Sequence, residues 1–164
     1  AMYSEKIKSV DELKDGDTIA LCSDASNKAR GLHLLESQGL ITLDDSVETP
    51  TQYDIKENKL NLKFIEADMQ VLPQSLPDVA AILCAAAHMV NAGLDGTEIA
   101  ISESQERMAS DDAETYAVGF VVRKEDKDAE WATGLAKAVQ CDALADYYKT
   151  EKKGTMVPMW ELNK

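Results

Sequence analysis

Short apolar segments alternate with segments of helical periodicity along this chain, and this alternation limits the fold more than any other feature. The segments of strand length are residues 18–22, 62–67, 79–84 and 98–102. Helical spacing is found in residues 24–39, 69–76, 85–92, 131–139 and 144–154. Strands joined through helices favour a parallel arrangement, because a parallel neighbour is reached only by a crossover connection. The chain is therefore predicted to have an α/β fold with a mainly parallel mixed sheet flanked by helices.

Local signals mark the ends of several predicted elements. Ser9 begins a capping-box pattern ahead of a short helix that runs through Leu13. Residues 15–17 (Asp-Gly-Asp) are typical of a turn. Asp24 is a predicted N-cap, and Gly39 is predicted to follow the last turn of the same helix.

Other segments are predicted to lie outside these alternating elements. Residues 42–61 are polar and are predicted to be mostly loop with one helical turn, and the acidic residues 104–114 are predicted to be a loop. Residues 116–123 (Tyr-Ala-Val-Gly-Phe-Val-Val-Arg) are β-branched and aromatic, and they form the strongest predicted strand of the chain. The apolar tail at residues 155–160 is predicted to pack against another part of the protein.

Composition excludes several classes of function. The 164 residues include 17 Lys and Arg against 30 Asp and Glu, which gives a net charge of −13. Binding to nucleic acid or to an anionic membrane requires a basic face, so no nucleic-acid partner is predicted. No apolar run is long enough to span a membrane. The three cysteines are odd in number and contain no CxxC pair, so neither a disulfide framework nor a metal site is predicted.

Catalysis is poorly supported by the sequence. Phosphate-loop, dinucleotide-loop and zinc-protease motifs are absent, and we predict no cofactor. His33 lies among leucines in a helix, as structural histidines do, while His88 follows a predicted strand but has no Ser or Cys nucleophile in a defined turn nearby. We therefore predict no catalytic residues and treat the protein as a non-enzyme.

The turn after residues 18–22 is the most informative stretch for ligand binding. It begins with Ser23 and Asp24, and it carries Asn27 and Arg30 three residues apart on one helical face. A helix amino terminus presents unpaired N–H groups, so a guanidinium and an amide beside it can receive a carboxylate. The alternative is that Asp24 caps the helix and the other polar side chains form a solvated face. The residues alone leave both interpretations open.

Taken together, the segments resemble the NlpA lipoprotein family, the methionine-binding proteins of ABC importers. The resemblance covers nearly the whole chain, in the segments 3–20, 24–41, 61–64, 72–81, 91–94, 120–128 and 153–160. It implies a periplasmic-binding-protein-like (type II) fold, in which residues 1–128 are the second lobe. Residues 129–164 would be carboxy-terminal helices and a tail that return toward a first lobe, which is absent from this chain.

Two departures from the family pattern affect the site. The family has Pro-Asn-Asp-Pro-x-Asn-x-x-Arg where this chain has residues 22–30, so Asn27 and Arg30 are retained. The family's Asn-x-Asn-Tyr is replaced by residues 85–88 (Ala-Ala-Ala-His). The resemblance implies Asn27 and Arg30 as ligand-binding residues, and we add His88 as a partial substitute for the asparagines, with Ser23 and Asp24.

The resemblance also implies function, partners and location. The chain would be the incomplete solute-binding component of an ABC importer, taking a methionine-like amino acid by its carboxylate and delivering it to a permease. The alternative is a degenerate paralogue that no longer binds an amino acid. A membrane-tethered lipoprotein outside the cytoplasm is expected if the full family architecture holds, and a cytoplasmic protein if Met2 is the true start. We also expect a homodimer through apolar surface that the first lobe normally covers.

Overall fold

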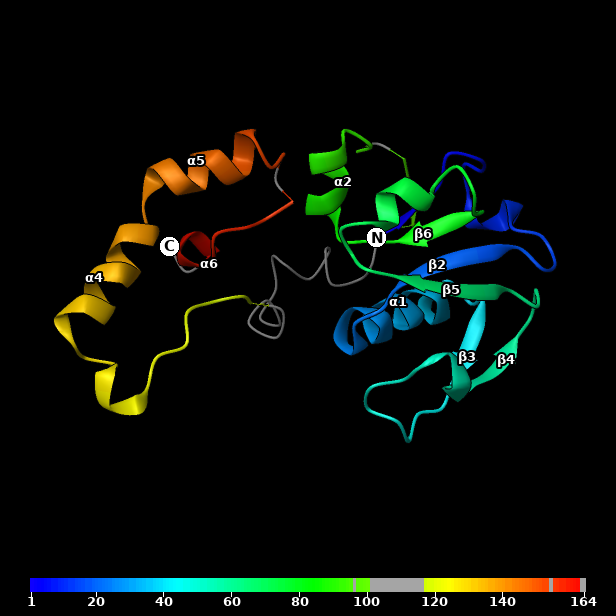
Figure 1. Cartoon of the computed structure of the whole chain (residues 1–164), viewed down its shortest axis with the longest axis horizontal. Helices are drawn as coiled ribbons and strands as arrows, with labels where there is room; N and C mark the ends of the chain where they lie inside the picture. The colour runs from blue at the N-terminus through cyan, green and yellow to red at the C-terminus, as the bar shows by residue number, and fades with distance from the viewer. Residues whose placement is uncertain (96, 101–116, 154, 163–164) are drawn as a thin grey trace. The chain divides into compact units, whose positions relative to one another are not determined.

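The computed structural model describes residues 1–95, 97–100, 117–153 and 155–162 (Figure 1). The chain divides into two compact units, residues 1–103 and 104–164, and each is described by itself. Among the described residues, no helix has both the length and the apolar character needed to cross a membrane. The assignment of residues 1–128 and 129–164 to a lobe and a returning segment stays a prediction.

A five-stranded sheet organises the first unit (Figure 1). Its strands are β1 (Met2–Tyr3), β2 (Thr18–Cys22), β5 (Lys63–Ala67), β6 (Ala81–Leu83) and β7 (Glu98–Ala100), in the order β5-β2-β6-β1-β7. Strand β2 is parallel to both of its neighbours, β5 and β6, whereas β1 is antiparallel to β6 and β7. The predicted mixed sheet is therefore confirmed, with its parallel pairings around β2.

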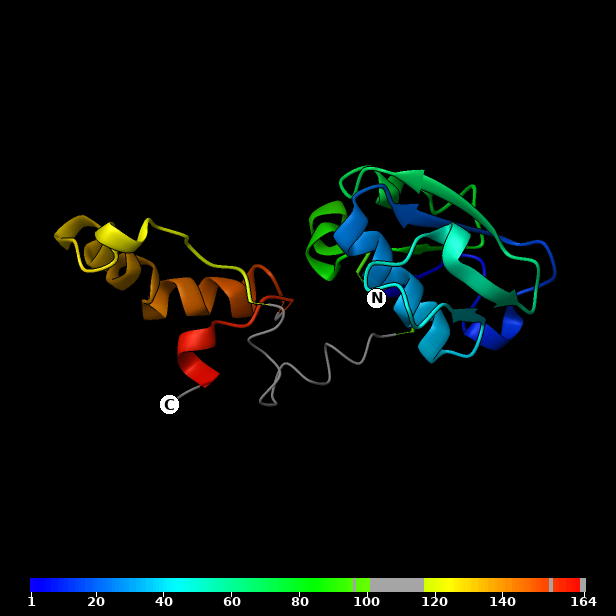
Figure 2. The ribbon, with the colours of Figure 1, turned by 90° about the horizontal axis from the view of Figure 1, so that it is seen from below.

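The two faces of β2 pack into two separate cores because successive side chains of a strand point to opposite sides. Ile19 and Leu21 lie in a core together with the leucines of helix α1 (Ala25–Ser37), which follows this face of the sheet (Figures 1 and 2). Ala20 and Cys22 lie in the other core. There they join Met89 of helix α2 (Ala86–Ala92) and residues of the 3₁₀ helix η3 (Leu72–Ser75). Both faces of the sheet are thus covered, as the alternation predicted.

The ends of these elements match their local signals in most places. Helix α1 begins after Asp24, and Gly39 follows it with φ +70°, in the left-handed region that glycine tolerates. Ser9 caps the 3₁₀ helix η1 (Val10–Glu12). Of the helix predicted at residues 69–76, only Leu72–Ser75 is helical, as the 3₁₀ helix η3, because Pro73 lacks the N–H that an α-helix starting at Met69 requires.

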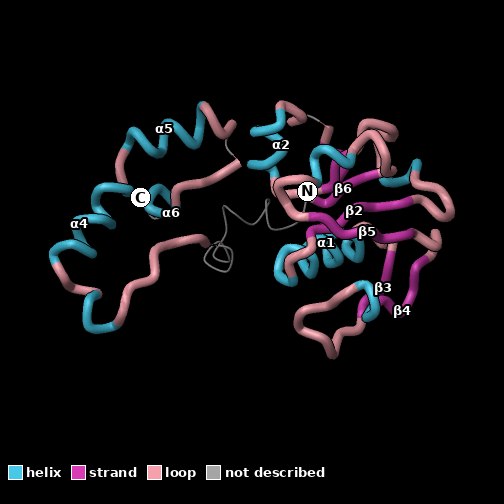
Figure 3. The backbone as a smooth tube through the Cα atoms, in the orientation of Figure 1, coloured by secondary structure: helices cyan, strands magenta, loops and turns pink. Residues whose placement is uncertain are grey.

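The prediction for residues 42–61 is confirmed in part: one helical turn is present and residues 44–51 and 59–61 lie outside helices and strands, but the two strands of this segment were not predicted. Strands β3 (Ile41–Leu43) and β4 (Ile55–Asn58) form a two-stranded antiparallel sheet that lies against α1 (Figure 3). A capped 3₁₀ helix, η2 (Gln52–Asp54), precedes β4. Ile41 and Leu43 are buried on one side of β3. Two apolar positions are too few to show a period, so no strand was predicted here.

The second unit is helical in its described part. It contains the 3₁₀ helix η6 (Lys124–Asp126) and the helices α4 (Glu130–Val139), α5 (Asp142–Thr150) and α6 (Met159–Leu162), which confirms the helices predicted at 131–139 and 144–154. The strand predicted at residues 116–123 is wrong over 117–123, where Val118 and Val121 are 95% and 98% exposed. A strand needs a neighbouring strand with which to form hydrogen bonds, and the described part of this unit contains none. The loop predicted at 104–114 lies outside the described residues.

Gly31 sets how closely α1 approaches the sheet. A Cβ atom at Gly31 would lie 3.3 Å from Leu83 Cβ and 3.2 Å from Leu83 Cδ1. Leu83 is buried in β6, so its Cβ is fixed by the strand backbone and has no room to move. Glycine is therefore required here for close packing, whereas Gly134 on α4 has no described atom within 4 Å of a Cβ.

We predict that Gly31→Ala lowers the free energy of unfolding by roughly 1–2 kcal/mol, because overpacking outweighs the gain in helix propensity. Urea unfolding followed by far-ultraviolet circular dichroism measures this change. Gly134→Ala is the matched control. It should raise the stability of the second unit by up to about 1 kcal/mol, read from the fluorescence of Trp131 and Trp160. A neutral or stabilising Gly31→Ala would contradict the close approach.

Candidate functional site

The candidate site lies at the edge of the sheet where three parallel strands end. Strands β5, β2 and β6 are neighbours and run in the same direction, so their carboxyl ends at Ala67, Cys22 and Leu83 meet at one edge. In open α/β sheets this edge is where ligands bind, where the chain passes from one side of a central strand to the other. Strand β2 is that central strand, since β5 and β6 flank it.

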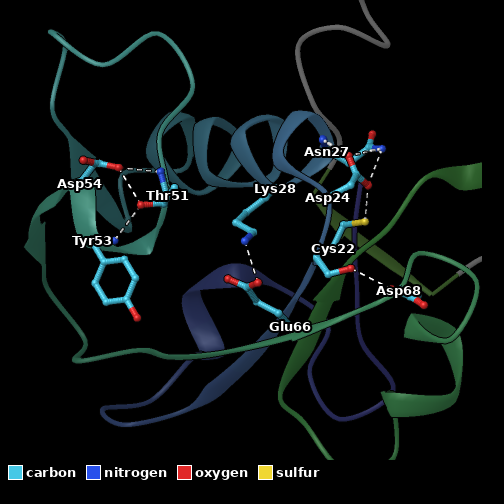
Figure 4. Close-up of polar contacts among 10 residues, drawn as sticks. Cys22, Asp24, Asn27, Lys28, Thr51, Tyr53, Asp54, Glu66 and Asp68 are labelled. Carbon is cyan, nitrogen blue, oxygen red and sulfur yellow. Dashed lines mark hydrogen bonds and ion pairs between the residues drawn. The ribbon is translucent and has the colours of Figure 1, made fainter.

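Hydrogen bonds tie the exits of β2 and β5 together. The Ser23 hydroxyl donates to Asp68 Oδ1 at 2.9 Å, and the Ser23 N–H donates to the carbonyl of Ala67 at 2.9 Å. One turn along α1, the Lys28 ammonium lies 2.6 Å from the Glu66 carboxylate (Figure 4). Ser23 therefore has a positioning role at this edge, because its hydroxyl is engaged in holding the two strand ends.

Asp24 is the centre of the polar contacts at the start of α1 (Figure 4). Its Oδ1 accepts the backbone N–H of Asn27 at 2.9 Å. The side-chain amide of Asn27 donates to both carboxylate oxygens, at 3.2 and 3.0 Å, and the Cys22 thiol donates to Oδ2 at 2.7 Å. The Asn27 N–H, followed by the Cys22 thiol and the Asn27 amide, lowers the pKa of Asp24 below its usual value. The helix start thus carries an ionised carboxylate held by its own chain.

Arg30 lies on the second turn of α1 and is exposed. Because α1 begins directly after β2, Arg30 lies on the helix that starts at the same edge of the sheet as Asp24. At the exit of β6, the amine of Ala1 donates to the carbonyl of Cys84 at 3.1 Å. Burial is the largest of the causes that lower the pKa of this amine to about 6, and the charge of Arg30 acts in the same direction.

His88 belongs to a different part of the first unit. It is half-buried on α2 and lines a pocket of about 440 Å³ together with Gln70, Pro73, Gln74, Asn91 and Ala92. The residues predicted on α1 and its preceding turn do not line this pocket. The structure thus brings Asp24 and Asn27 into contact, places Ser23 against Asp68 at the neighbouring strand end, and leaves His88 among a separate set of amides. His88 and Asn91 are three residues apart on one helix, and this spacing is the sequence signal that could have predicted that they line the same pocket.

The family assignment follows from comparison with known proteins. Residues 1–160 match the model of the NlpA lipoprotein family. The chain belongs to this family. The resemblance found in the order of sequence motifs is thereby confirmed.

Relatives of this NlpA-family chain are solute-binding proteins. It is 38% identical to the D-methionine-binding lipoprotein MetQ of Salmonella typhi, over 98% of this chain and 58% of the relative. A nutrient binding protein from Burkholderia cenocepacia bound to methionine is 32% identical, with a TM-score of 0.75 over 95% of this chain and 64% of that structure. A periplasmic substrate-binding protein of an ABC transporter from Coxiella burnetii is 29% identical, with a TM-score of 0.75 over 96% of this chain and 64% of that one.

These comparisons confirm the predicted periplasmic-binding-protein-like fold. The chain spans about 58% of the length of the curated relatives that it matches. The NlpA-family relatives bind solutes and belong to transporters, so the family gives no support to a catalytic role.

The cap formed by Asp24 makes a testable contribution to stability. We predict that Asp24→Ala lowers the free energy of unfolding by about 1 kcal/mol at neutral pH, since the Asn27 N–H loses its acceptor. The folded-state pKa of Asp24 is depressed, so its ionised form stabilises the fold above the unfolded-state pKa of about 3.9. The difference between the two proteins should therefore shrink as pH falls below about 4.

Urea unfolding of both proteins between acidic and neutral pH measures this difference. The control is Asp24→Asn, which keeps a side-chain oxygen at the N-cap and should cost only a few tenths of a kcal/mol. An Asp24→Ala protein as stable as the parent at neutral pH would show that the cap contributes nothing.

Proposed function

We propose that this chain is part of the solute-binding component of an ABC importer and that it binds a methionine-like amino acid through the ligand's carboxylate. The observation that carries the proposal is the placement of Asn27 and Arg30 at the carboxyl edge of β2, β5 and β6, in a family with a methionine-bound relative. The ligand's carboxylate would meet the Arg30 guanidinium, which is suited to bidentate contact with planar anions.

The charges around the start of α1 suit a zwitterion. Asp24 stays ionised, because the hydrogen bonds that it accepts lower its pKa, and Arg30 carries the opposite charge on the same helix. A free amino acid has one carboxylate and one ammonium group, which pair with a guanidinium and a carboxylate respectively. The Asn27 amide, already directed at Asp24, would then contact both the protein carboxylate and the ligand. Ser23 would hold the strand exits, and His88 would contribute from its pocket on α2.

The same proposal covers partners and location. A permease is the expected partner, since a solved relative is the substrate-binding protein of an ABC transporter. The full-length protein is proposed to be a lipoprotein held at a membrane outside the cytoplasm, as the family description and the curated relatives suggest. We propose no enzymatic activity, and no step of the binding role requires a cofactor.

The second candidate is a degenerate paralogue that binds no amino acid. It is favoured by the first turn of α2, which begins after Ala85 without a side-chain cap. Ala85 and Ala87 stand where the family pattern has asparagines, so this turn has lost two amides that orient a ligand. The two candidates make opposite predictions for binding.

Isothermal titration calorimetry separates them. We expect heat with L- or D-methionine, and a loss of about 10- to 150-fold in affinity for Arg30→Met, since a charge-assisted hydrogen bond contributes roughly 1.5–3 kcal/mol. Lys28→Met is the matched control, because it removes the same charge from the same helix at a side chain engaged with Glu66. A version extended to the full length of the family should be titrated in parallel.

The outcomes distinguish the candidates clearly. Binding that falls with Arg30→Met and survives Lys28→Met supports the amino-acid receptor. The absence of heat from either version with any of the common amino acids rejects it and favours the degenerate paralogue. Equal losses in both variants would show that net charge, and not a receptor at Arg30, determines binding.

The homodimer remains a proposal that rests on apolar side chains of the second unit. Trp131 and Tyr147 are exposed, and Tyr148 and Trp160 are half-buried. Exposed aromatic side chains of this size favour self-association, since burying them removes apolar area from water. We expect a dimeric mass by light scattering at micromolar concentration, and a shift toward the monomer for Trp131→Glu. A monomeric parent protein contradicts the proposal.

A further inference from the structure

Two buried cysteines lie at the ends of the neighbouring central strands: Cys22 is the last residue of β2, and Cys84 directly follows β6. The parallel register of β2 and β6 pairs Ile19 with Ala81 and Ala20 with Ile82. Continuing this register by two residues places Cys22 beside Cys84, on the face of the sheet that Ala20 and Ile82 share. Both side chains belong to the same core, and they are only 2% and 4% exposed. The pair was invisible in the sequence, where 61 residues separate the two cysteines.

A third sulfur atom lies beside this pair. The Sγ of Cys84 is 3.7 Å from the Sδ of Met69 and 3.8 Å from the Met69 carbonyl. The backbone of Met69 also contributes to the pKa of Cys22, which burial raises above its usual value. Burial raises the pKa of Cys84 to about 11, and the neighbouring Cys22 thiol acts in the same direction. The Cys84 thiol therefore contacts Met69, which is itself half-buried, and the strand register places Cys22 next to Cys84.

An unsatisfied hydroxyl group lies in the same core. Tyr3 is fully buried, and its OH has no hydrogen-bond partner among the described residues. It belongs to the core that contains both cysteines, and Cys84 is one of the groups that raise the pKa of its hydroxyl, after burial and Glu98. A buried donor without an acceptor costs about 1–3 kcal/mol, so it signals a missing partner. A thiolate at Cys84 would be such an acceptor.

The geometry favours a bridging ion over a disulfide. Neighbouring strands lie about 4.8 Å apart, and in-register side chains of parallel strands stand side by side at about that spacing. A disulfide draws its two Cβ atoms to about 3.8 Å, which would require the strands to bend. Two sulfurs bound to one ion by bonds of about 2.3 Å lie up to roughly 4.6 Å apart, which matches the strand spacing.

We propose that Cys22, Cys84 and Met69 form a binding site for a soft, thiophilic metal ion, with Cu(I) as its best occupant, and that Tyr3 donates a hydrogen bond to the Cys84 sulfur. Two thiolates and a thioether are the ligand set that Cu(I) accepts, while harder cations require oxygen ligands. Among the described residues no group of three or more His, Cys, Asp or Glu side chains is placed to hold a metal. The thioether of Met69 is what completes this set.

Binding of the metal ion would release protons from the two cysteine thiols. Each cysteine thiol would release its proton to solvent as its sulfur binds the ion, and no electron is transferred. Cys22 would also give up its hydrogen bond to Asp24 and turn its sulfur toward Cys84. Because two protons leave, affinity should rise steeply with pH, by up to about 100-fold per unit below the thiol pKa values.

The test is a competition titration under anaerobic conditions, in which the fully reduced 164-residue chain takes Cu(I) from a coloured Cu(I) chelator. We expect one ion per chain. Cys22→Ser and Cys84→Ser should each weaken binding by at least about 100-fold, because each removes a thiolate ligand. The control is Cys141→Ser, which removes the third cysteine, on the second unit, and should leave binding unchanged.

A conservative variant protects the test against misfolding. Tyr3→Phe removes only the unpartnered hydroxyl, so the metal-free protein should be as stable as the parent or more stable. Its affinity for Cu(I) should nevertheless fall by about 10- to 100-fold, as it does when a hydrogen bond to a metal ligand is lost. Met69→Leu conserves volume and should also weaken binding while the circular dichroism spectrum stays unchanged.

Three results would overturn the proposal. One is binding that survives in both Cys22→Ser and Cys84→Ser. Another is binding that disappears in Cys141→Ser, which would place the ion on the second unit. The last is a parent chain with two fewer titratable thiols in air, a Cys22–Cys84 crosslink found by peptide mass spectrometry, and no Cu(I) bound when reduced.

Discussion

The parallel pairing of β2 with strands on both sides is the interaction on which the rest of the first unit depends. Because β2 is central, its alternating side chains are buried on both faces, and helices pack against each face of the sheet. Gly31 lets α1 lie close to one face, while η3 and α2 close the other. The same pairing brings three strand ends to one edge, so the polar turn after Cys22 is a consequence of how the core is built.

At this edge, structural and binding interpretations of the same residues coincide. Asp24 caps α1 and is also the anion that fixes Asn27, so the capping interpretation of the sequence is realised in the structure. Under the proposed function this would not compete with ligand binding, because a cap that stays ionised would supply one of the two charges that a zwitterion requires. Arg30, six residues further along the chain, would supply the other. A helix start without Asp24 would be a simpler anion site and would discriminate less well between an amino acid and other carboxylates.

The ends of helices could be predicted from the sequence, whereas contacts between distant segments could not. Asp24 and Gly39 mark the ends of α1 because capping depends on a few neighbouring residues. Residues 117–123 have the composition of a strand, but the described part of their unit contains no strand with which they pair. Strand β3 does pair with β4, but it has only three residues, too few for a periodic signal. Ser23, Asp24 and Asn27 could be grouped from their spacing in the sequence. The contact of Ser23 with Asp68, and the register that aligns Cys22 with Cys84, depend on strand order, which periodicity does not encode.

Strand β1 has a consequence for how the protein reaches its fold. It is inserted between β6 and β7, and its neighbour Ser4 donates to the carbonyl of Ala80, 76 residues away along the chain. Closing so long a loop is entropically costly until the segments between are ordered, so β1 should join after β2, α1, β5 and β6 have assembled. The strand that makes the sheet continuous is thus the one added late, and until then β6 presents an open edge to other chains. Residues 2–4 are synthesised before their partners in β6 and β7, so they cannot pair until those strands have been made.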